Sequence, residues 1–167
     1  HNNRIPTLPH MPRFQEVLRL ESHHVPHMIY APGLLQPRRI HEAVSLIDVM
    51  PTVAGLIGLE YDNTTLGRDI QQPAPEGDRT AFVVLREGPR PQIGAVTADH
   101  MARLNHDGED ASLHKLYSDN PEQDRSDADP ETFQHLFDLA RGFYEPSRYP
   151  FYDNAIRDRR DAPAGDQ

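Results

Sequence analysis

Short apolar runs separated by polar turns predict a small sheet in the middle of the chain. Thr80–Leu85 has the length and the β-branched content of a strand. Residues 92–96 and 101–104 flank the short polar link Ala98-Asp99-His100, a pattern typical of a β-hairpin. Residues 113–117 follow a turn cluster and predict one more strand. We expect these strands to be antiparallel.

Helical spacing appears at both ends of the chain. Between residues 132 and 144, the side chains of Phe133, Leu136, Phe137, Ala140 and Phe143 fall on one face of a helix, which predicts an amphipathic helix. After a proline-rich start, four apolar residues between positions 14 and 20 approximate the same spacing. The sequence therefore predicts a short helix before the sheet and a longer one after it.

The stretch from residue 24 to residue 59 predicts a strand followed by a helix. Val25–Ala31 is short, apolar and partly β-branched and ends at Pro32-Gly33, which is typical of a buried strand with a break after it. Residues 40–48 have the character of a short extended piece. Pro51 suits the first turn of a helix that runs through Leu59, and the Asp48 carboxylate is a candidate cap for it.

The overall composition limits the classes of function. A length of 167 residues indicates one domain or part of one. The net charge of −9, with no basic stripe interleaved with aromatic residues, argues against nucleic acid as a partner. The absence of cysteine excludes a disulfide framework and a thiolate metal site. No apolar run approaches the roughly 20 residues that span a bilayer.

Histidines are the first candidates for chemistry, because the chain has ten of them. The densest group is His23, His24 and His27, but on a strand its members alternate between two faces, so three convergent ligands do not result. A structural or exposed role is the first interpretation, and a pocket-lining role for one member is the second. Asp99-His100 lies at the tip of the predicted hairpin, where a polar surface turn is expected whatever the function.

Several segments together resemble a known family. The sequence gives, in order, a strand, a Pro-Gly break, a crossover and a Pro-started helix, in the segments VPHMIYAPG, SLIDVMPT and LGRDI. This order resembles the segment after the second metal-binding motif of sulfatases and of phosphoglycerol transferases of the lipoteichoic acid synthase type. This family belongs to the alkaline phosphatase superfamily. LHKLYSDNPEQDRSD resembles the sulfatase-type tail, although Ser118, Asp119 and Asn120 depart from the commoner spelling, and GFYEPSRYPFYDN is similar to a stretch of membrane-linked members.

The resemblance implies an α/β fold. Residues 1–156 would be the C-terminal part of a sulfatase-like catalytic domain, with part of an alkaline-phosphatase-like mixed sheet, flanking helices, a small antiparallel sheet and a C-terminal helix. Residues 157–167 are charged, contain Pro and Gly and have little to bury, which predicts a disordered tail. The catalytic nucleophile and the acidic metal ligands would lie upstream, so none is expected within this chain.

The resemblance also assigns provisional roles to three residues. HNNR at the start is similar to the end of an Asp-His-Asn-x-Arg metal motif, which makes His1 a ligand for a divalent ion, namely manganese, magnesium or calcium, shared with upstream residues. Arg4 would approach an anionic substrate group, and His24 would face the pocket from its strand. In such enzymes a metal-activated nucleophile attacks a sulfate or phosphate ester and forms a covalent intermediate.

We therefore expect a C-terminal fragment of a metal-dependent sulfatase-like hydrolase or phosphoglycerol transferase that is inactive alone. Its substrate would be a sulfate or phosphate ester, with lipid- or glycan-linked esters included, and its partner would be the upstream part of the same domain. The resemblance implies a location on the periplasmic or extracellular face of the cytoplasmic membrane. Two alternatives stay open: a non-catalytic α/β binding module or degenerate homologue, and a histidine-based metal-binding protein.

Overall fold

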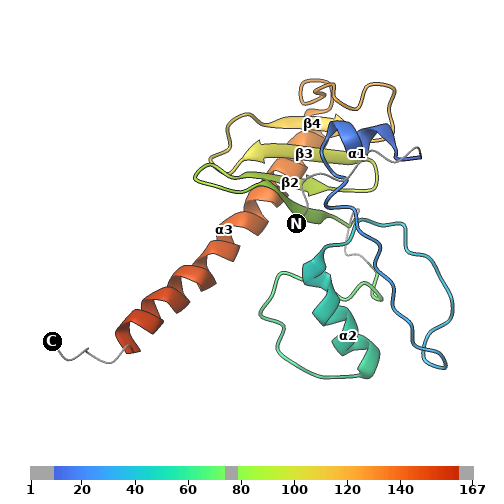
Figure 1. Cartoon of the computed structure of the whole chain (residues 1–167), viewed down its shortest axis with the longest axis vertical. Coiled ribbons are helices and arrows are strands. Elements are labelled where there is room, and N and C mark those ends of the chain that lie inside the picture. The colour runs from blue at the N-terminus through green and yellow to red at the C-terminus, as the bar shows by residue number, and fades with distance from the viewer. Residues whose placement is uncertain (1–9, 74–78, 162–167) are drawn as a thin grey trace.

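A four-stranded antiparallel sheet lies between two helices, and a third helix stands in a separate lobe below it (Figure 1). The computed structural model describes residues 10–73 and 79–161, with side chains described as far as Arg148. In chain order its elements are α1 (Arg13–Val17), the 3-10 turn η1 (Leu46–Asp48), α2 (Val49–Ile57), β1 (Ala81–Arg86), β2 (Gln92–Val96), β3 (His100–Asn105), β4 (Ser112–Lys115) and α3 (Pro130–Asp161).

The sheet is a simple meander in the order β1-β2-β3-β4, so each strand pairs with its neighbour in the sequence. Ile93 on β2 lies opposite both Val84 on β1 and Leu104 on β3. Every connection is a short turn, as expected for antiparallel neighbours. The strands predicted between residues 80 and 117, with their hairpin, are therefore confirmed, together with the α/β fold class.

Apolar side chains cover both faces of the sheet because the strands alternate in side-chain direction. On one face the strands pack against α3, and the buried residues are Ile93, Ala95, Ala102, Leu104, Leu113, Leu136 and Ala140. On the other face they pack against α1 and the turn after it, through Phe14, Leu18, Leu20, Met101 and Leu116. Both helices expected from periodicity are confirmed as the two outer layers.

Helix α3 is longer than its apolar pattern predicted. The first half, with Leu136 and Ala140, lies on β2 and β3, and the rest extends away from the sheet (Figure 1). The helix continues to Asp161, past the apolar pattern that predicted it and into the segment from Arg157 for which the sequence predicted a disordered tail. Residues 162–167 lie outside the described part of the chain.

The prediction of a strand at Val25–Ala31 is wrong. These residues form neither helix nor strand, and Val25, Met28 and Tyr30 are 54%, 86% and 85% exposed. A strand is stable only when a neighbour satisfies its backbone groups, and within residues 10–73 and 79–161 no strand pairs with this segment. Residues 40–45 likewise have no strand, so the one sheet of the described chain is antiparallel and not mixed.

Candidate functional site

Asp48 connects SLIDVMPT and LGRDI, the two segments of the α2 lobe that carry the family resemblance. Its buried carboxylate accepts one hydrogen bond from the Ser45 backbone N–H at 2.8 Å and another from the Arg68 backbone N–H at 2.9 Å. Sequence analysis made Asp48 a cap for α2, but its side chain makes no capping bond to that helix. Since a carboxylate bonded to backbone N–H groups makes strong hydrogen bonds, Asp48 fixes the loop at residues 66–68 against the start of α2.

Thr52 continues this connection one helical turn later. It is fully buried, donates a hydrogen bond from its hydroxyl to the Asp48 carbonyl at 2.6 Å and accepts one from the Ile70 backbone N–H at 3.1 Å. The loop also passes very close to the helix at Gly67, where an added Cβ would lie 1.9 Å from the Ile47 carbonyl oxygen. SLIDVMPT and LGRDI therefore form one hydrogen-bonded unit.

Ser45 joins this unit to the sheet. Its hydroxyl donates to the Phe82 carbonyl at 3.1 Å and accepts from the Phe82 backbone N–H at 2.9 Å. Phe82 lies on β1, the edge strand, so the hydroxyl satisfies edge groups that have no neighbouring strand. The lobe and the sheet are thus held together by polar contacts at a sheet edge.

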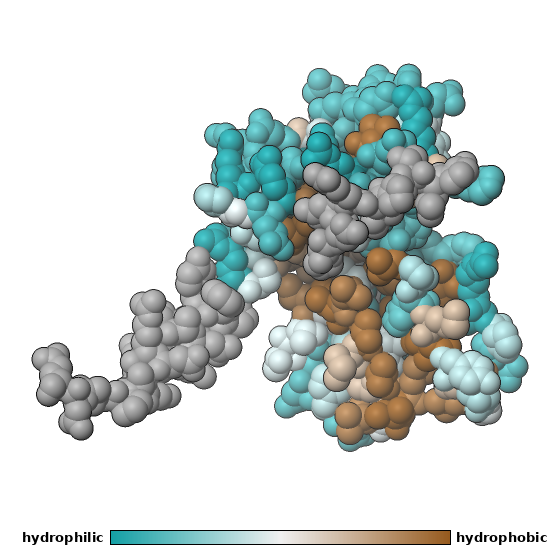
Figure 2. Space-filling model, viewed as in Figure 1, coloured by the Kyte–Doolittle hydropathy of each residue, from teal (hydrophilic) through white to brown (hydrophobic). Residues whose placement is uncertain are grey.

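The outer side of α2 carries a row of exposed apolar side chains. Leu46, Met50, Val53 and Ile57 follow helical spacing and are 80%, 70%, 39% and 66% exposed. Figure 2 shows hydrophobic colour gathered on this lobe, whereas the face over the sheet is mostly hydrophilic. We call these four residues the α2 stripe. Exposed apolar patches of this kind are typical of surfaces that contact another protein segment, a membrane or a ligand.

A groove in the same lobe is lined by basic side chains. It has a volume of about 410 Å³ and lies between residues 38–42 and residues 70–73, with Arg79 as part of its wall. Arg79 is 5% exposed, forms an ion pair with Glu42 and donates to the Ile70 carbonyl at 3.2 Å. Because Glu42 and Ile70 belong to opposite walls, the Arg79 side chain holds the two walls together.

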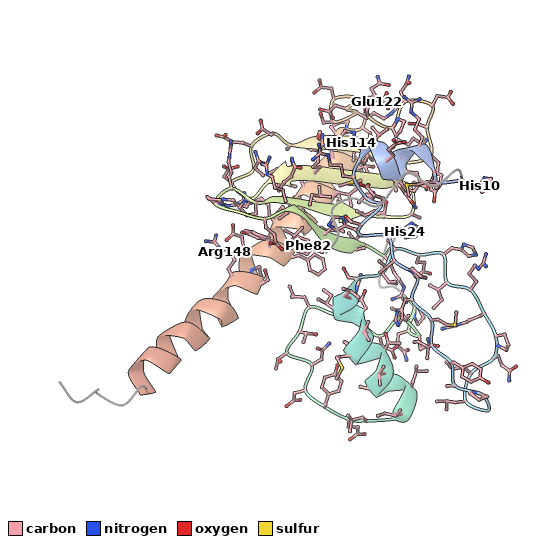
Figure 3. The ribbon with its side chains drawn as sticks, viewed as in Figure 1. His10, His24, Phe82, His114, Glu122 and Arg148 are labelled. Atoms are coloured by element: carbon pink, nitrogen blue, oxygen red, sulfur yellow. The ribbon has the colours of Figure 1, made fainter. Side chains whose placement is uncertain are left out.

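The predicted site residues do not meet at one place in the described structure. His24 is exposed, forms a short contact from Nδ1 to the Gln15 amide of α1, and is not among the residues that line the groove described above (Figure 3). His23 contacts the Val84 carbonyl through Nε2 at 3.0 Å. These contacts support the structural interpretation of the histidine run. His1 and Arg4 lie outside the described residues.

No metal centre is assembled by the part of the chain that the structure describes. Within residues 10–73 and 79–161, no group of three or more His, Asp and Glu side chains is placed to hold a metal ion. Asp99 is exposed in the link between β2 and β3, and the Thr97 backbone N–H donates to the His100 carbonyl at 2.8 Å to close this turn. The surface-turn interpretation of Asp99-His100 is therefore confirmed.

The LHKLYSDNPEQD segment forms a folded loop around His114. This side chain is 2% exposed, with Nε2 2.9 Å from the Ser112 hydroxyl and Nδ1 3.0 Å from the Pro121 carbonyl. Burial, and after it the nearby Arg103 cation, lowers the pKa of His114. Burial opposes ionisation of Asp124, but hydrogen bonds from the Ser126 and Leu113 backbone N–H groups lower its pKa. The hydrogen bonds from this loop hold it against the edge of the sheet at β4.

Comparisons with known proteins agree with a distant family relationship. No protein-family model matches the chain. Over 67 residues the chain is 40% identical to the lipoteichoic acid synthase-like YvgJ of Bacillus subtilis (strain 168). This match covers 38% of the chain but 10% of that protein, so the chain spans about a tenth of the length of the curated relative. The relationship is thus to a lipoteichoic acid synthase-like protein, through a limited segment.

None of the described helices combines the length and the apolar character needed to cross a bilayer.

Sequence reasoning missed the basic groove. Arg79 is separated from Arg38 and Arg39 by about 40 positions, and only the fold brings them to one groove. The available signal was the run PRRIH at residues 37–41, which concentrates positive charge in an otherwise acidic chain.

Proposed function

We propose that this chain is the C-terminal part of a metal-dependent sulfatase-like hydrolase or phosphoglycerol transferase that acts on sulfate or phosphate esters. The observation that carries the proposal is the 40% identity to a lipoteichoic acid synthase-like protein. The unit formed by SLIDVMPT and LGRDI supports it, because the two segments behind the resemblance are joined through Asp48 and Thr52. In this proposal the chain alone has no turnover.

The α2 stripe supports a role as one part of a larger domain. Four apolar side chains in helical register are exposed on η1 and α2, whose opposite side is buried and anchored by Thr52. Apolar side chains left in water contribute nothing to folding, whereas their burial stabilises by about 25 cal/mol per Å². We propose that the upstream part of the catalytic domain covers the stripe, together with exposed Met28 and Tyr30.

The proposal includes a divalent metal ion, with His1 as one of its ligands. The described side chains form no metal cluster of their own, so the remaining ligands and the nucleophile would come from upstream residues. His1 would be the metal ligand contributed by this chain, and Arg4 would approach the anionic part of the ester. We also propose that the complete protein works outside the cytoplasmic membrane, by analogy with the family.

The test uses the protein encoded by the complete gene together with the 167-residue chain. Both are assayed with bis(p-nitrophenyl) phosphate and p-nitrophenyl sulfate, with manganese, magnesium or calcium added and then with a chelator. The proposal expects turnover by the complete protein with at least one metal, loss of that turnover with chelator or with His1→Ala, and none from the chain alone.

Turnover that persists in the His1→Ala variant would show that His1 is not a ligand. No turnover by the complete protein on esters of either kind would favour the non-catalytic module or degenerate homologue. Activity of the 167-residue chain alone, lost with chelator, would contradict its assignment as an inactive part.

A further inference from the structure

The basic groove is a site that neither the family resemblance nor the relative assigns. We propose that the groove between residues 38–42 and 70–73 binds a tetrahedral oxyanion, a phosphate or sulfate group, through Arg38, Arg39 and His41. The inference rests on side chains of the described structure and stands whether or not the complete protein is an ester hydrolase.

Charge is the first argument. The whole chain has a formal charge of −9, yet the groove is lined by Arg38, Arg39 and Arg79 against the single carboxylate of Glu42, with His41 beside them. Glu42 is already paired with Arg79. Among the described residues that line the groove, the two remaining guanidinium groups leave an excess of positive charge, which attracts anions.

The walls of the groove are fixed before any ligand arrives. Arg79 is nearly buried and connects Glu42 on one wall with the carbonyls of Ile70 and Gln72 on the other. Arg38 crosses the groove as well, since its Nη2 donates to the Gln71 side-chain carbonyl at 2.5 Å. A preformed groove loses less conformational entropy on binding than a flexible loop does.

Hydrogen-bond donors remain available for the ligand. A guanidinium group has five N–H donors, and Arg38 uses one of them on Gln71. For Arg39 and His41, both exposed, the described residues provide no side-chain hydrogen bond or ion pair. Arginine favours phosphate and sulfate because its planar fork donates two parallel hydrogen bonds to adjacent oxygens. A tetrahedral oxyanion satisfies these donors better than a carboxylate with two oxygens does.

The test is an NMR titration of the ¹⁵N-labelled 167-residue chain with sodium phosphate and with sodium sulfate, at an ionic strength kept constant with sodium chloride. The proposal expects saturable shifts of the amide signals of Arg39, Ile40, Gln71 and Gln72, with a Kd of about 1 mM, the order expected for so small a ligand. Amides of β2 and β3 should stay in place and report an intact fold.

Matched variants distinguish a specific anion site from general electrostatic attraction between anions and the chain. Arg39→Ala should weaken binding about tenfold, as expected for loss of a charge-assisted hydrogen bond, and Arg39→Lys should weaken it less because the charge remains. Arg90→Ala is the control, because Arg90 forms its ion pairs with Asp107 and Glu109 and does not line the groove. It should leave the Kd unchanged. Both Arg39 and Arg90 are exposed, so neither variant threatens the fold.

Three results would overturn the inference: equal shifts with chloride alone, shifts spread over the whole chain, or an unchanged Kd in Arg38→Ala/Arg39→Ala. A parallel titration with glycerol 1-phosphate identifies the source of the group. A lower Kd than that of inorganic phosphate supports a phosphate ester as the ligand, and an equal Kd supports recognition of the oxyanion itself.

Discussion

The Thr52 hydroxyl accepts a hydrogen bond from the Ile70 backbone N–H across a fully buried contact of 3.1 Å. The same hydroxyl donates to the Asp48 carbonyl, so a single side chain satisfies a group one turn before it in the sequence and another 18 residues after it. A buried N–H without a partner costs free energy, and the hydroxyl removes that cost for Ile70. The Thr52 oxygen therefore holds Ile70 on α2, beside the contact that the Asp48 carboxylate makes with Arg68.

Replacement of Thr52 by Val keeps the shape of the side chain but removes this oxygen. We expect Thr52→Val to lower the free energy of unfolding by about 2 kcal/mol, because the Ile70 N–H is left buried and unpaired. Urea unfolding followed by circular dichroism measures the change. Thr64→Val is the control, since Thr64 is exposed on the same lobe, and it should change stability by less than about 0.5 kcal/mol. Equal effects of the two substitutions would refute the role of Thr52.

Two glycines should respond to alanine in opposite directions. At Gly67 the added methyl group would meet the Ile47 carbonyl oxygen at 1.9 Å, so Gly67→Ala must push the loop off η1. We expect a loss of about 2 kcal/mol, as for an overpacked site. At Gly142, inside α3, no atom lies within 4 Å of the added methyl, and Gly142→Ala should stabilise the helix by up to about 1 kcal/mol. Thermal melts of both variants provide the comparison; a Gly67→Ala variant as stable as the parent would contradict the close contact.

The sheet could be predicted from the sequence because each of its strands pairs with its neighbour in the chain, so the pattern of a short segment is sufficient. The hairpin of β2 and β3 has short apolar strands on both sides of a polar turn, and the core half of α3 repeats apolar residues at helical spacing. The strand expected at Val25–Ala31 failed for a physical reason. An apolar run becomes a strand only beside a partner, and the sequence pattern of one segment does not show whether its partner exists.

The lobe was predictable in outline and not in its contacts. Pro51 and the apolar run after it indicated α2 correctly, although the helix begins at Val49. The role of Asp48 was misjudged, because its second partner, the Arg68 N–H, comes from a loop 20 residues away. The groove was not predicted for the same reason, because its walls come from segments far apart in the sequence. Arg38 and Arg79 line the same groove although they are 41 positions apart in the sequence.

His114 should make stability depend on pH. Burial lowers its pKa below the ordinary value of 6.5, so the folded chain holds it neutral while the unfolded chain binds a proton near that pH. The unfolded state therefore takes up more protons as pH falls, and stability should decrease from about pH 6.5 downward. Asp107 and Asp124 have pKa values lowered from 3.8, so their stabilising effects are lost only at more acidic pH.

Unfolding in urea between pH 7.5 and pH 5 measures this slope. His114→Gln should flatten it, because glutamine does not titrate, although its overall stability will be lower if a hydrogen bond to Ser112 or Pro121 is lost. His135→Gln is the matched control, since His135 is exposed on α3, and it should leave the slope as it is in the parent. A slope that survives in His114→Gln would assign the pH dependence to another group.

The α2 stripe predicts self-association of the 167-residue chain. Leu46, Met50, Val53 and Ile57 are exposed on one side of a helix, so two copies can cover each other's stripe in the absence of another partner. We expect Met50→Glu/Ile57→Glu to shift sedimentation profiles toward the monomer and to lower the fluorescence of a bound hydrophobic dye, because both charges lie at exposed positions seven residues apart. Asn120→Asp/Gln123→Glu adds the same two charges on the exposed loop after β4 and should have little effect. If both double variants shift the profile equally, net charge and not the stripe controls association, and the stripe would lose its support as the surface that another part of the domain covers.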